Sequence, residues 1–429
     1  MLLNGMQKVK DYNEFRHRRR TIKRATIFLI AVFCILTTGF FLRGYAPKIV
    51  GLMRQPAGSD LSGLAALVIQ NCAGADHRQN CYDKEIPRLM DKISMEDAFR
   101  VTRLIQKLDS GYWYCHVLGH EIAAAETKKN PDQWKDVVAR CPSGMCSNGC
   151  IHGAFQERFR AEALPGVAVG DITKQLENIC EPRPGWQPTG LERGTCYHAL
   201  GHLLMYVTAA DIKKSLALCS DLAKTAAGDF TQLCFDGAFM QIFQPLEPED
   251  IALVKGKQPA KDELSAFCRA FPDRQRGSCW TEGWPLYLDD IVRPGGVAGF
   301  CDALSHAPAE QERCYTALFY VIPAEFRFDL TKISQYCALL PERRMGSCYA
   351  NAASRLIETD WALTKSAIQL CQEAGLRQRQ AEENCYGALA SFAAYTFRVD
   401  SPEALDLCRR LPDPWRNQCL RRNNPGEMP

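Results

Sequence analysis

Hydrophobic residues along most of the chain recur at helical spacing, in segments that proline and polar residues interrupt. Residues 401–408 show the start of one segment, because Ser401 suits the N-cap of a helix and Pro402 suits its first helical position. Beyond such an interruption a second helical pattern begins at a cysteine, as in residues 385–395. The pattern predicts an all-α protein made of helix pairs joined by short turns.

A pair of cysteines brackets each predicted turn and recurs at a regular interval. The clearest copies, 268–279, 337–348 and 408–419, share a cysteine, two residues, an apolar residue, proline, a polar stretch and a second cysteine. From position 279 onward the second cysteines are 35, 34, 37 and 34 residues apart, insertions lengthen the intervals between 150 and 279 to as much as 46, and the stretch between 81 and 150 has room for one further unit. We expect an α-solenoid of disulfide-linked helix-turn-helix repeats, with a period of about 34–46 residues. The architecture resembles tetratricopeptide arrays, although their consensus sequence is absent.

The even number of cysteines between positions 72 and 419 indicates disulfide bonds and an oxidising compartment. Zinc ribbons are excluded, because their paired cysteines lie about two to four residues apart and these pairs are mostly farther apart. The repeat itself predicts eight bonds, its register adds Cys141–Cys150, and Cys115–Cys146 then remains. The eight are Cys72–Cys81, Cys180–Cys196, Cys219–Cys234, Cys268–Cys279, Cys301–Cys314, Cys337–Cys348, Cys371–Cys385 and Cys408–Cys419.

The N-terminal part of the chain predicts a membrane anchor. A basic cluster within residues 16–24 precedes the uncharged apolar stretch 25–42, which as a helix would span about 27 Å. The basic flank should stay in the cytoplasm, so that the rest of the chain lies outside it. A cleaved signal peptide is the alternative, but no convincing small-x-small cleavage site is present.

Five parts follow from these boundaries. They are a basic cytoplasmic tail (1–24), a transmembrane anchor (25–42), a linker (43–60), an extracytoplasmic helical-repeat domain (61–422) and a C-terminal tail (423–429). The chain has no Asn-x-Ser/Thr sequon, which favours a bacterial protein over a eukaryotic secreted one. We therefore expect a single-pass protein of a bacterial inner membrane, with its large domain in the periplasm or outside the cell.

Five of the eight histidines fall within a short part of the chain and at related positions of the repeat. Two pairs have i, i+4 spacing, which places both imidazoles of a pair on one face of a helix. Equivalent helices of a solenoid run side by side, so these side chains should converge on its inner wall together with one aspartate from the next repeat. The candidate metal ligands are His116, His120, His152, His198, His202 and Asp236.

Three functions fit this pattern. The first is a binding protein that holds a transition metal, zinc or copper, because imidazole suits both ions. The second is an enzyme that uses the same cluster with a metal for hydrolysis or oxidation. The third is a structural interaction scaffold in which the histidines only pack. A protein or peptide ligand on the inner face of the solenoid fits the first and third functions.

Several other classes are excluded. The net charge is only +3, and much of the positive excess lies in the first 24 residues, so the main body shows no nucleic-acid-binding surface. Neither Cys-x-x-Cys nor Cys-x-x-Cys-His occurs, which argues against thioredoxin-like redox chemistry and covalent c-type haem. No Gly-x-Ser-x-Gly, glycine-rich phosphate loop or His-Glu-x-x-His motif is present.

Overall fold

The computed structural model of the protein describes residues 60–423, except 110, 113, 161–168, 246–247 and 305. Leu61–Pro429 forms one compact unit by its internal contacts. The predicted cytoplasmic tail, the predicted membrane anchor and all but the last residue of the linker lie outside the described residues. No helix in the described part of the chain is both long and apolar enough to cross a membrane.

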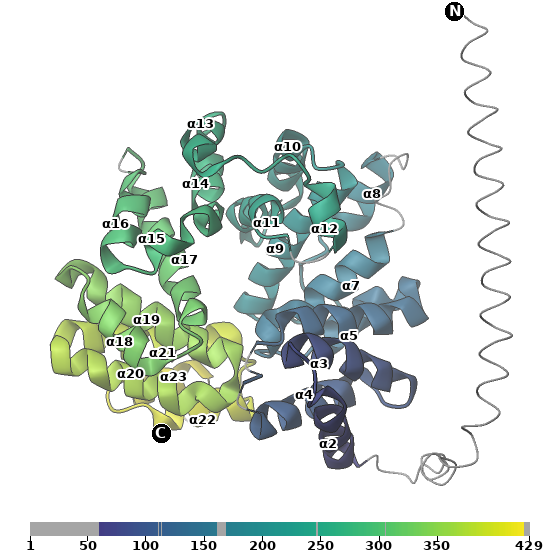
Figure 1. The fold of residues 1–429 in the computed structure, drawn as a ribbon, viewed down its shortest axis with the longest axis horizontal. Coiled ribbons are helices and arrows are strands. Elements are labelled where there is room, and N and C mark those ends of the chain that lie inside the picture. The colour runs from purple at the N-terminus through teal and green to yellow at the C-terminus, as the bar shows by residue number, and fades with distance from the viewer. Residues whose placement is uncertain are drawn as a thin grey trace, which may run out of the picture. The chain divides into compact units, whose positions relative to one another are not determined.

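The described chain is almost entirely helical (Figure 1). Its one small sheet is an antiparallel hairpin of β1 (Lys224–Thr225) and β2 (Gly228–Asp229). The α-helices follow one another as α2 (Leu61–Cys72), α3 (Arg78–Arg88), α4 (Met95–Leu108), α5 (His116–Lys129), α6 (Trp134–Arg140), α7 (Gly149–Arg160), α8 (Val169–Leu176), α9 (Gly190–Val207), α10 (Ile212–Leu222), α11 (Thr231–Phe243), α12 (Pro248–Leu253), α13 (Leu264–Arg269), α14 (Asp273–Glu282), α15 (Leu288–Ile291), α16 (Pro294–Asp302), α17 (Pro308–Glu325), α18 (Leu330–Ala338), α19 (Glu342–Thr359), α20 (Thr364–Arg377), α21 (Arg379–Thr396), α22 (Pro402–Arg410) and α23 (Trp415–Asn423). Short 3-10 helices are η2 (Leu89–Asp91), η3 (Pro131–Gln133), η4 (Cys146–Asn148), η5 (Lys261–Glu263), η6 (Trp284–Tyr287) and η7 (Trp361–Leu363).

The ten disulfide bonds of the described residues have the pairing expected from the sequence: nine follow the repeat and its register, and the tenth joins the two cysteines that remain. Nine of them join the two helices of one repeat, with sequence separations of 9 to 16 between the cysteines. The tenth, Cys115–Cys146, has a separation of 31 residues and joins the start of α5 to η4. Closing a loop of 10 to 17 residues stabilises a fold by roughly 3 kcal/mol. Disulfides in such number indicate an oxidising, extracytoplasmic environment.

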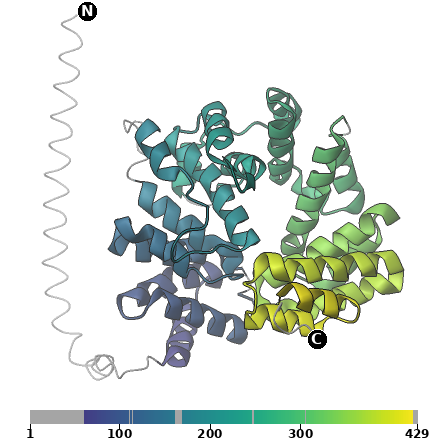
Figure 2. The same cartoon turned by 180° about the vertical axis from the view of Figure 1, so that it is seen from behind.

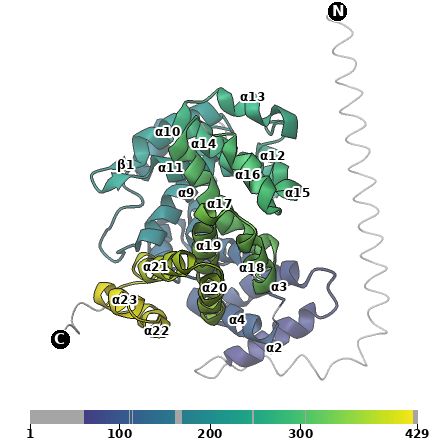
Figure 3. The ribbon, with the colours of Figure 1, turned by 90° about the vertical axis from the view of Figure 1, so that its left-hand side faces the viewer.

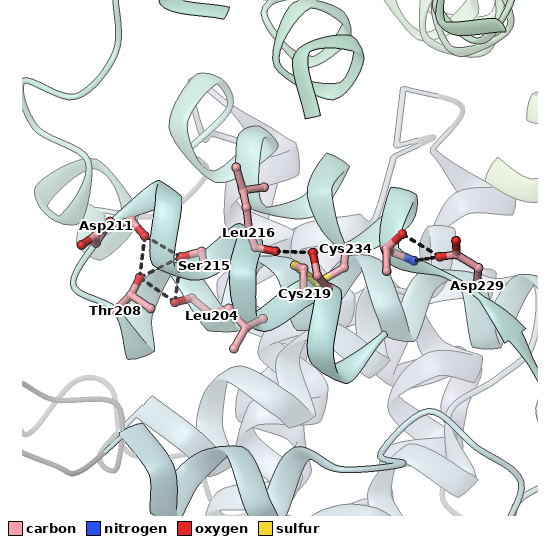
Figure 4. The surroundings of a disulfide bond; sticks show 10 residues. Leu204, Thr208, Asp211, Ser215, Leu216, Cys219, Asp229 and Cys234 are labelled. Atoms are coloured by element: carbon pink, nitrogen blue, oxygen red, sulfur yellow. Dashed lines mark hydrogen bonds between the residues drawn. A yellow bond between two sulfur atoms is a disulfide. The ribbon is translucent and has the colours of Figure 1, made fainter. Parts of the chain in front are cut away.

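The repeat that contains α10 and α11 shows how one unit is held (Figure 4). Its disulfide, Cys219–Cys234, joins the two helices. At the start of α11, Asp229 accepts hydrogen bonds from the backbone N–H and the hydroxyl of Thr231, at 3.1 and 2.6 Å. The buried Ser215 hydroxyl donates a hydrogen bond to the Leu204 carbonyl of the preceding helix at 3.2 Å, so this unit is also held to its neighbour.

The second helices of successive repeats pack against one another in chain order. Contacts run from α5 to α7, α9, α11, α14, α17, α19, α21 and α23. In Figure 3, α14, α17 and α19 follow one another from the top of the view downward. These neighbour contacts establish helical repeats, and the α-solenoid remains a prediction.

Contacts also join repeats that lie far apart in the chain. Helix α21 packs on α9, and α19 packs on η4. Figure 2 shows the yellow C-terminal helices in front, beside the blue part of the chain. Ser143 donates a hydrogen bond to the Thr396 carbonyl at 3.0 Å, and the rings of Tyr395 and Phe397 lie against Gly190 and Gly144. The C-terminal repeats therefore cover one side of the histidine-bearing helices.

Candidate metal centre

The five histidines predicted from the sequence form one continuous group of rings. His116 and His120 come from α5, His152 from α7, and His198 and His202 from α9. The His152 ring centroid lies 5.1 and 5.2 Å from those of His116 and His120, and 5.9 and 5.7 Å from those of His198 and His202. His152 is therefore the ring that joins the two i, i+4 pairs.

Glycines allow these helices to pack backbone against backbone. A Cβ atom at Gly153 would overlap the His120 carbonyl, and one at Gly237 would overlap the His198 carbonyl. Gly201 lies equally close to the backbone of α11, and a Cβ atom at Gly119 would lie 3.0 Å from the Cys150 nitrogen of α7. Because any side chain at these positions would separate the helices, the glycines set the distance across which the imidazoles meet.

The first histidine pair has its two Nε2 atoms within hydrogen-bonding distance of each other. The His116 Nδ1 lies 3.2 Å from the Cys146 carbonyl oxygen, which can only accept, so Nδ1 carries the proton and Nε2 presents its lone pair. The Nε2 atoms of His116 and His120 are 3.1 Å apart. Two nitrogens that bind one tetrahedral ion at about 2.0–2.1 Å lie about 3.3 Å apart, so this separation suits a shared ion.

His152 completes a set of three nitrogen ligands. Among the described residues, His116, His120 and His152 form the group whose ligand atoms all lie within 4.8 Å of one another. The His152 side chain is 6% exposed, and its Nε2 atom is buried with no hydrogen-bond partner among those residues. A buried polar atom left without a partner costs about 1–3 kcal/mol, and a metal ion would remove that cost.

The second pair, on α9, has a similar arrangement. The Nε2 atoms of His198 and His202 are 3.1 Å apart, and the His202 Nδ1 donates to the Gln241 side-chain oxygen at 2.6 Å. The His198 Nε2 also lies 3.2 Å from the sulfur of Met240. Both neighbours of this pair, Met240 and Gln241, come from α11.

Burial keeps His116, His152, His198 and His202 neutral. Burial lowers the pKa of His116 and of His152 well below the ordinary value, and their neighbouring histidines lower both further. Burial and His202 lower the pKa of His198 to about 3, and burial lowers that of His202 as well. Neutral imidazole is the form that binds metals, so the site is poised for an ion near neutral pH.

Asp236, the sixth predicted ligand, is not part of this group. Its carboxylate accepts hydrogen bonds from Arg313 at 2.9 and 3.1 Å and from the Ser278 hydroxyl at 2.6 Å. Arg313 is also paired with Glu310 at 3.0 Å. The position that holds histidine in the two preceding repeats therefore holds an ion-paired aspartate here.

A buried contact between two ionisable side chains beside the group could not be predicted from the sequence. Arg355 and Glu358, both on α19, lie 3.4 Å apart at their closest atoms, and Arg355 also reaches the Ser147 hydroxyl at 3.3 Å. The positive charge of Arg355 is one of the contributions that lower the pKa of His116. Residues 147 and 355 are 208 positions apart, so no local pattern in the sequence signals their contact.

Glu358→Gln is expected to raise the stability of the protein at alkaline pH. Burial raises the pKa of the Glu358 carboxyl from the ordinary 4.5 to about 8. Between pH 4.5 and about pH 8, folding therefore takes up a proton, and the free energy of unfolding falls as the pH rises through this range. The variant removes that dependence and should gain about 2–4 kcal/mol over the wild type at about pH 8 and little below about pH 4.5. Melting temperatures of both proteins across this range measure the difference, and parallel curves would contradict it.

Comparisons with known proteins add no relative. No protein-family model matches the chain. No curated protein and no solved structure matches it at the level required. The functional assignment therefore depends on the chemistry of the histidine group itself.

Proposed function

We propose that the protein binds a transition-metal ion through His116, His120 and His152. The observation that carries this proposal is the buried His152, whose Nε2 has no hydrogen-bond partner among the described residues and whose ring offers a ligand atom within 4.8 Å of those of the other two. Imidazole ligands suit zinc and copper, the two metals that we expect. Three imidazole ligands from two closely packed helices provide a preformed site.

A second candidate function is metal-dependent hydrolysis or oxidation at the same site. Sites with three protein ligands commonly keep a fourth position open for water or substrate, as catalytic zinc sites do. An ion held by His116, His120 and His152 would supply a polarised water there. The ion-binding role comes first because it needs only the residues that the structure brings together.

The setting that we propose for this site is extracytoplasmic. A helix formed by residues 25–42 would anchor the chain in a bacterial inner membrane, and an α-solenoid would carry the metal site on the periplasmic or outer side. The ten disulfide bonds support the oxidising compartment. The inner face of the solenoid would be the surface for a protein or peptide ligand.

Metal titration of the full-length protein tests the proposal. After removal of bound metal with a chelator, the protein is titrated with Zn²⁺ and with Co²⁺, whose visible absorption reports coordination by nitrogen ligands. We expect about one equivalent to bind, with an affinity that falls at least about 100-fold in His152→Ala, because one of three ligands is lost. His77→Ala is the matched control, since His77 is exposed and its side chain makes no helix-capping bond.

Two outcomes would overturn the proposal. One is binding of less than about a tenth of an equivalent of either ion by the wild type. The other is equal affinity in His152→Ala and His77→Ala, with circular dichroism showing that both are folded. Either result would favour the third function, a scaffold in which the histidines serve packing.

A further inference from the structure

We infer that His198, His202 and Met240 form a second metal subsite, which takes a soft monovalent ion, Cu(I). This inference stands on atoms outside the three-histidine set, and it does not require an ion at that set. Its ligands are two imidazole nitrogens and one thioether sulfur. They meet where α9 and α11 pack against each other.

The ligand atoms of this subsite are already close together. The His198 Nε2 lies 3.1 Å from the His202 Nε2 and 3.2 Å from the Met240 sulfur. The His202 Nδ1 donates a hydrogen bond to Gln241, so the His202 Nε2 carries a lone pair and can accept or ligate. Without an ion, a single N–H of His198 would have to serve both the His202 nitrogen and the Met240 sulfur. With an ion, all three atoms become ligands.

The packing of α9 on α11 makes this arrangement. Gly237 lies directly against the His198 carbonyl, in a contact that admits no side chain at that position. One helical turn separates His198 from His202, and Met240 follows Gly237 on α11 by three residues, which places it on the same side of its helix. The thioether is therefore fixed beside the histidine pair by backbone contact rather than by side-chain packing alone.

The donor set selects the ion. Thioether sulfur favours Cu(I) over zinc and over harder divalent ions. Thiolates, the other soft ligands of proteins, are not available here, because all the cysteines in the described part of the chain form disulfides. Burying an ion with neutral ligands costs less for a single charge than for a double one, since the desolvation energy of an ion rises with the square of its charge. Two neutral imidazoles and a thioether therefore match a monovalent soft ion.

His152 lies between the two subsites. Its ring is within 6 Å, centroid to centroid, of all four other histidines. His198 and Met240 are half-buried, whereas His116, His120 and His152 are buried. The subsite that contains Met240 is thus more accessible than the three-histidine set. The His152 ring lies next to both.

Copper binding under reducing conditions tests the inference. The full-length protein is titrated anaerobically with Cu(I) in competition with a chromogenic Cu(I) chelator, with ascorbate present to keep the copper reduced. We expect Met240→Leu to weaken Cu(I) binding at least about tenfold, because it removes a ligand while keeping the apolar volume. Met205→Leu is the matched control, since Met205 is a fully buried methionine on α9 that is absent from the ligand set.

The metal environment gives a second readout that does not depend on affinity. In protein labelled with selenomethionine, the copper X-ray absorption spectrum should show a selenium neighbour, and Met240→Leu should remove it. Zn²⁺ binding at the three-histidine set should stay unchanged in the same variant, which separates failure of this inference from failure of the proposed function. Copper without a selenium neighbour in the wild type, or equal Cu(I) affinity in Met240→Leu and Met205→Leu, would overturn the second subsite.

Discussion

Gly153→Ala is expected to destabilise the protein by about 3 kcal/mol and to weaken metal binding at the three-histidine set. The added methyl group would overlap the carbonyl and Cα atoms of His120, which belong to the backbone and cannot rotate away. Helices α5 and α7 would have to separate, and His152, the residue before Gly153, would move away from His116 and His120. Thermal unfolding should show a melting temperature lowered by roughly 5 °C, and Zn²⁺ titration should show a lower affinity.

Gly299→Ala is the matched control for this substitution. Gly299 also lies within a helix, α16, but a Cβ atom there would meet no other atom within 4 Å. Alanine in place of a helical glycine with open space should stabilise the protein by about 0.5–1 kcal/mol. If Gly153→Ala raised the melting temperature as Gly299→Ala does, the inference that α5 and α7 pack backbone against backbone would be wrong.

The sequence predicted the features that repeat along the chain. Regular spacing of cysteines determines which residues lie at the two ends of each turn, and the structure has the corresponding bonds, including Cys141–Cys150 and Cys115–Cys146. The same register placed His152 and His198 at equivalent positions of neighbouring helices. Periodicity carries this information because each repeat packs on the next one in the same way.

Features that depend on a single contact between distant repeats could not be predicted. Asp236 occupies the repeat position of a histidine, and only the presence of Arg313, 77 residues later, turns it into half of an ion pair. Likewise, Arg355 reaches the histidine group because α19 packs on η4, a contact that no spacing in the sequence reveals. If each repeat contacted only its neighbours along the chain, Arg355 and Ser147 would lie far apart.

The glycines show a third kind of limit. Gly119 and Gly201 precede the second histidine of each i, i+4 pair, and the sequence analysis attached meaning only to the histidines. In the structure these glycines bring the helix backbones into contact, so they are as necessary to the group as the imidazoles are. Each histidine pair, together with the glycine before its second histidine, therefore supplies both the ligands and the close contact with the next helix.

Removing one disulfide bond should separate stability from metal binding. The double variant Cys115→Ser with Cys146→Ser opens the one bond that joins α5 to η4. The chain-entropy model gives a loss of about 3.5–4 kcal/mol for a loop closed by cysteines 31 residues apart. Cys146, Ser147 and Asn148 in η4 all have positive φ angles, of 51°, 46° and 56°, a conformation that side chains disfavour. Without the bond, η4 should relax.

Relaxation of η4 should carry the effect to the metal site. The Cys146 carbonyl accepts a hydrogen bond from the His116 Nδ1, and this contact orients the His116 ring. We therefore expect the variant to bind Zn²⁺ at least about tenfold more weakly, as for other losses of contacts that orient metal-binding histidines. Melting temperature and Zn²⁺ affinity are measured on the same preparations.

The double variant Cys408→Ser with Cys419→Ser supplies the comparison. Its cysteines are 11 residues apart in the last repeat, so its loss of stability should be similar, about 3 kcal/mol. The bond joins α22 to α23, which carry none of the histidines of the group, and Zn²⁺ affinity should therefore not change. If both double variants lost affinity equally, the cause would be loss of the fold as a whole, and the role of η4 in orienting His116 would be wrong. If only the first lost affinity, the bond between neighbouring repeats would have a second role besides stability, which is to hold a metal-binding histidine in place.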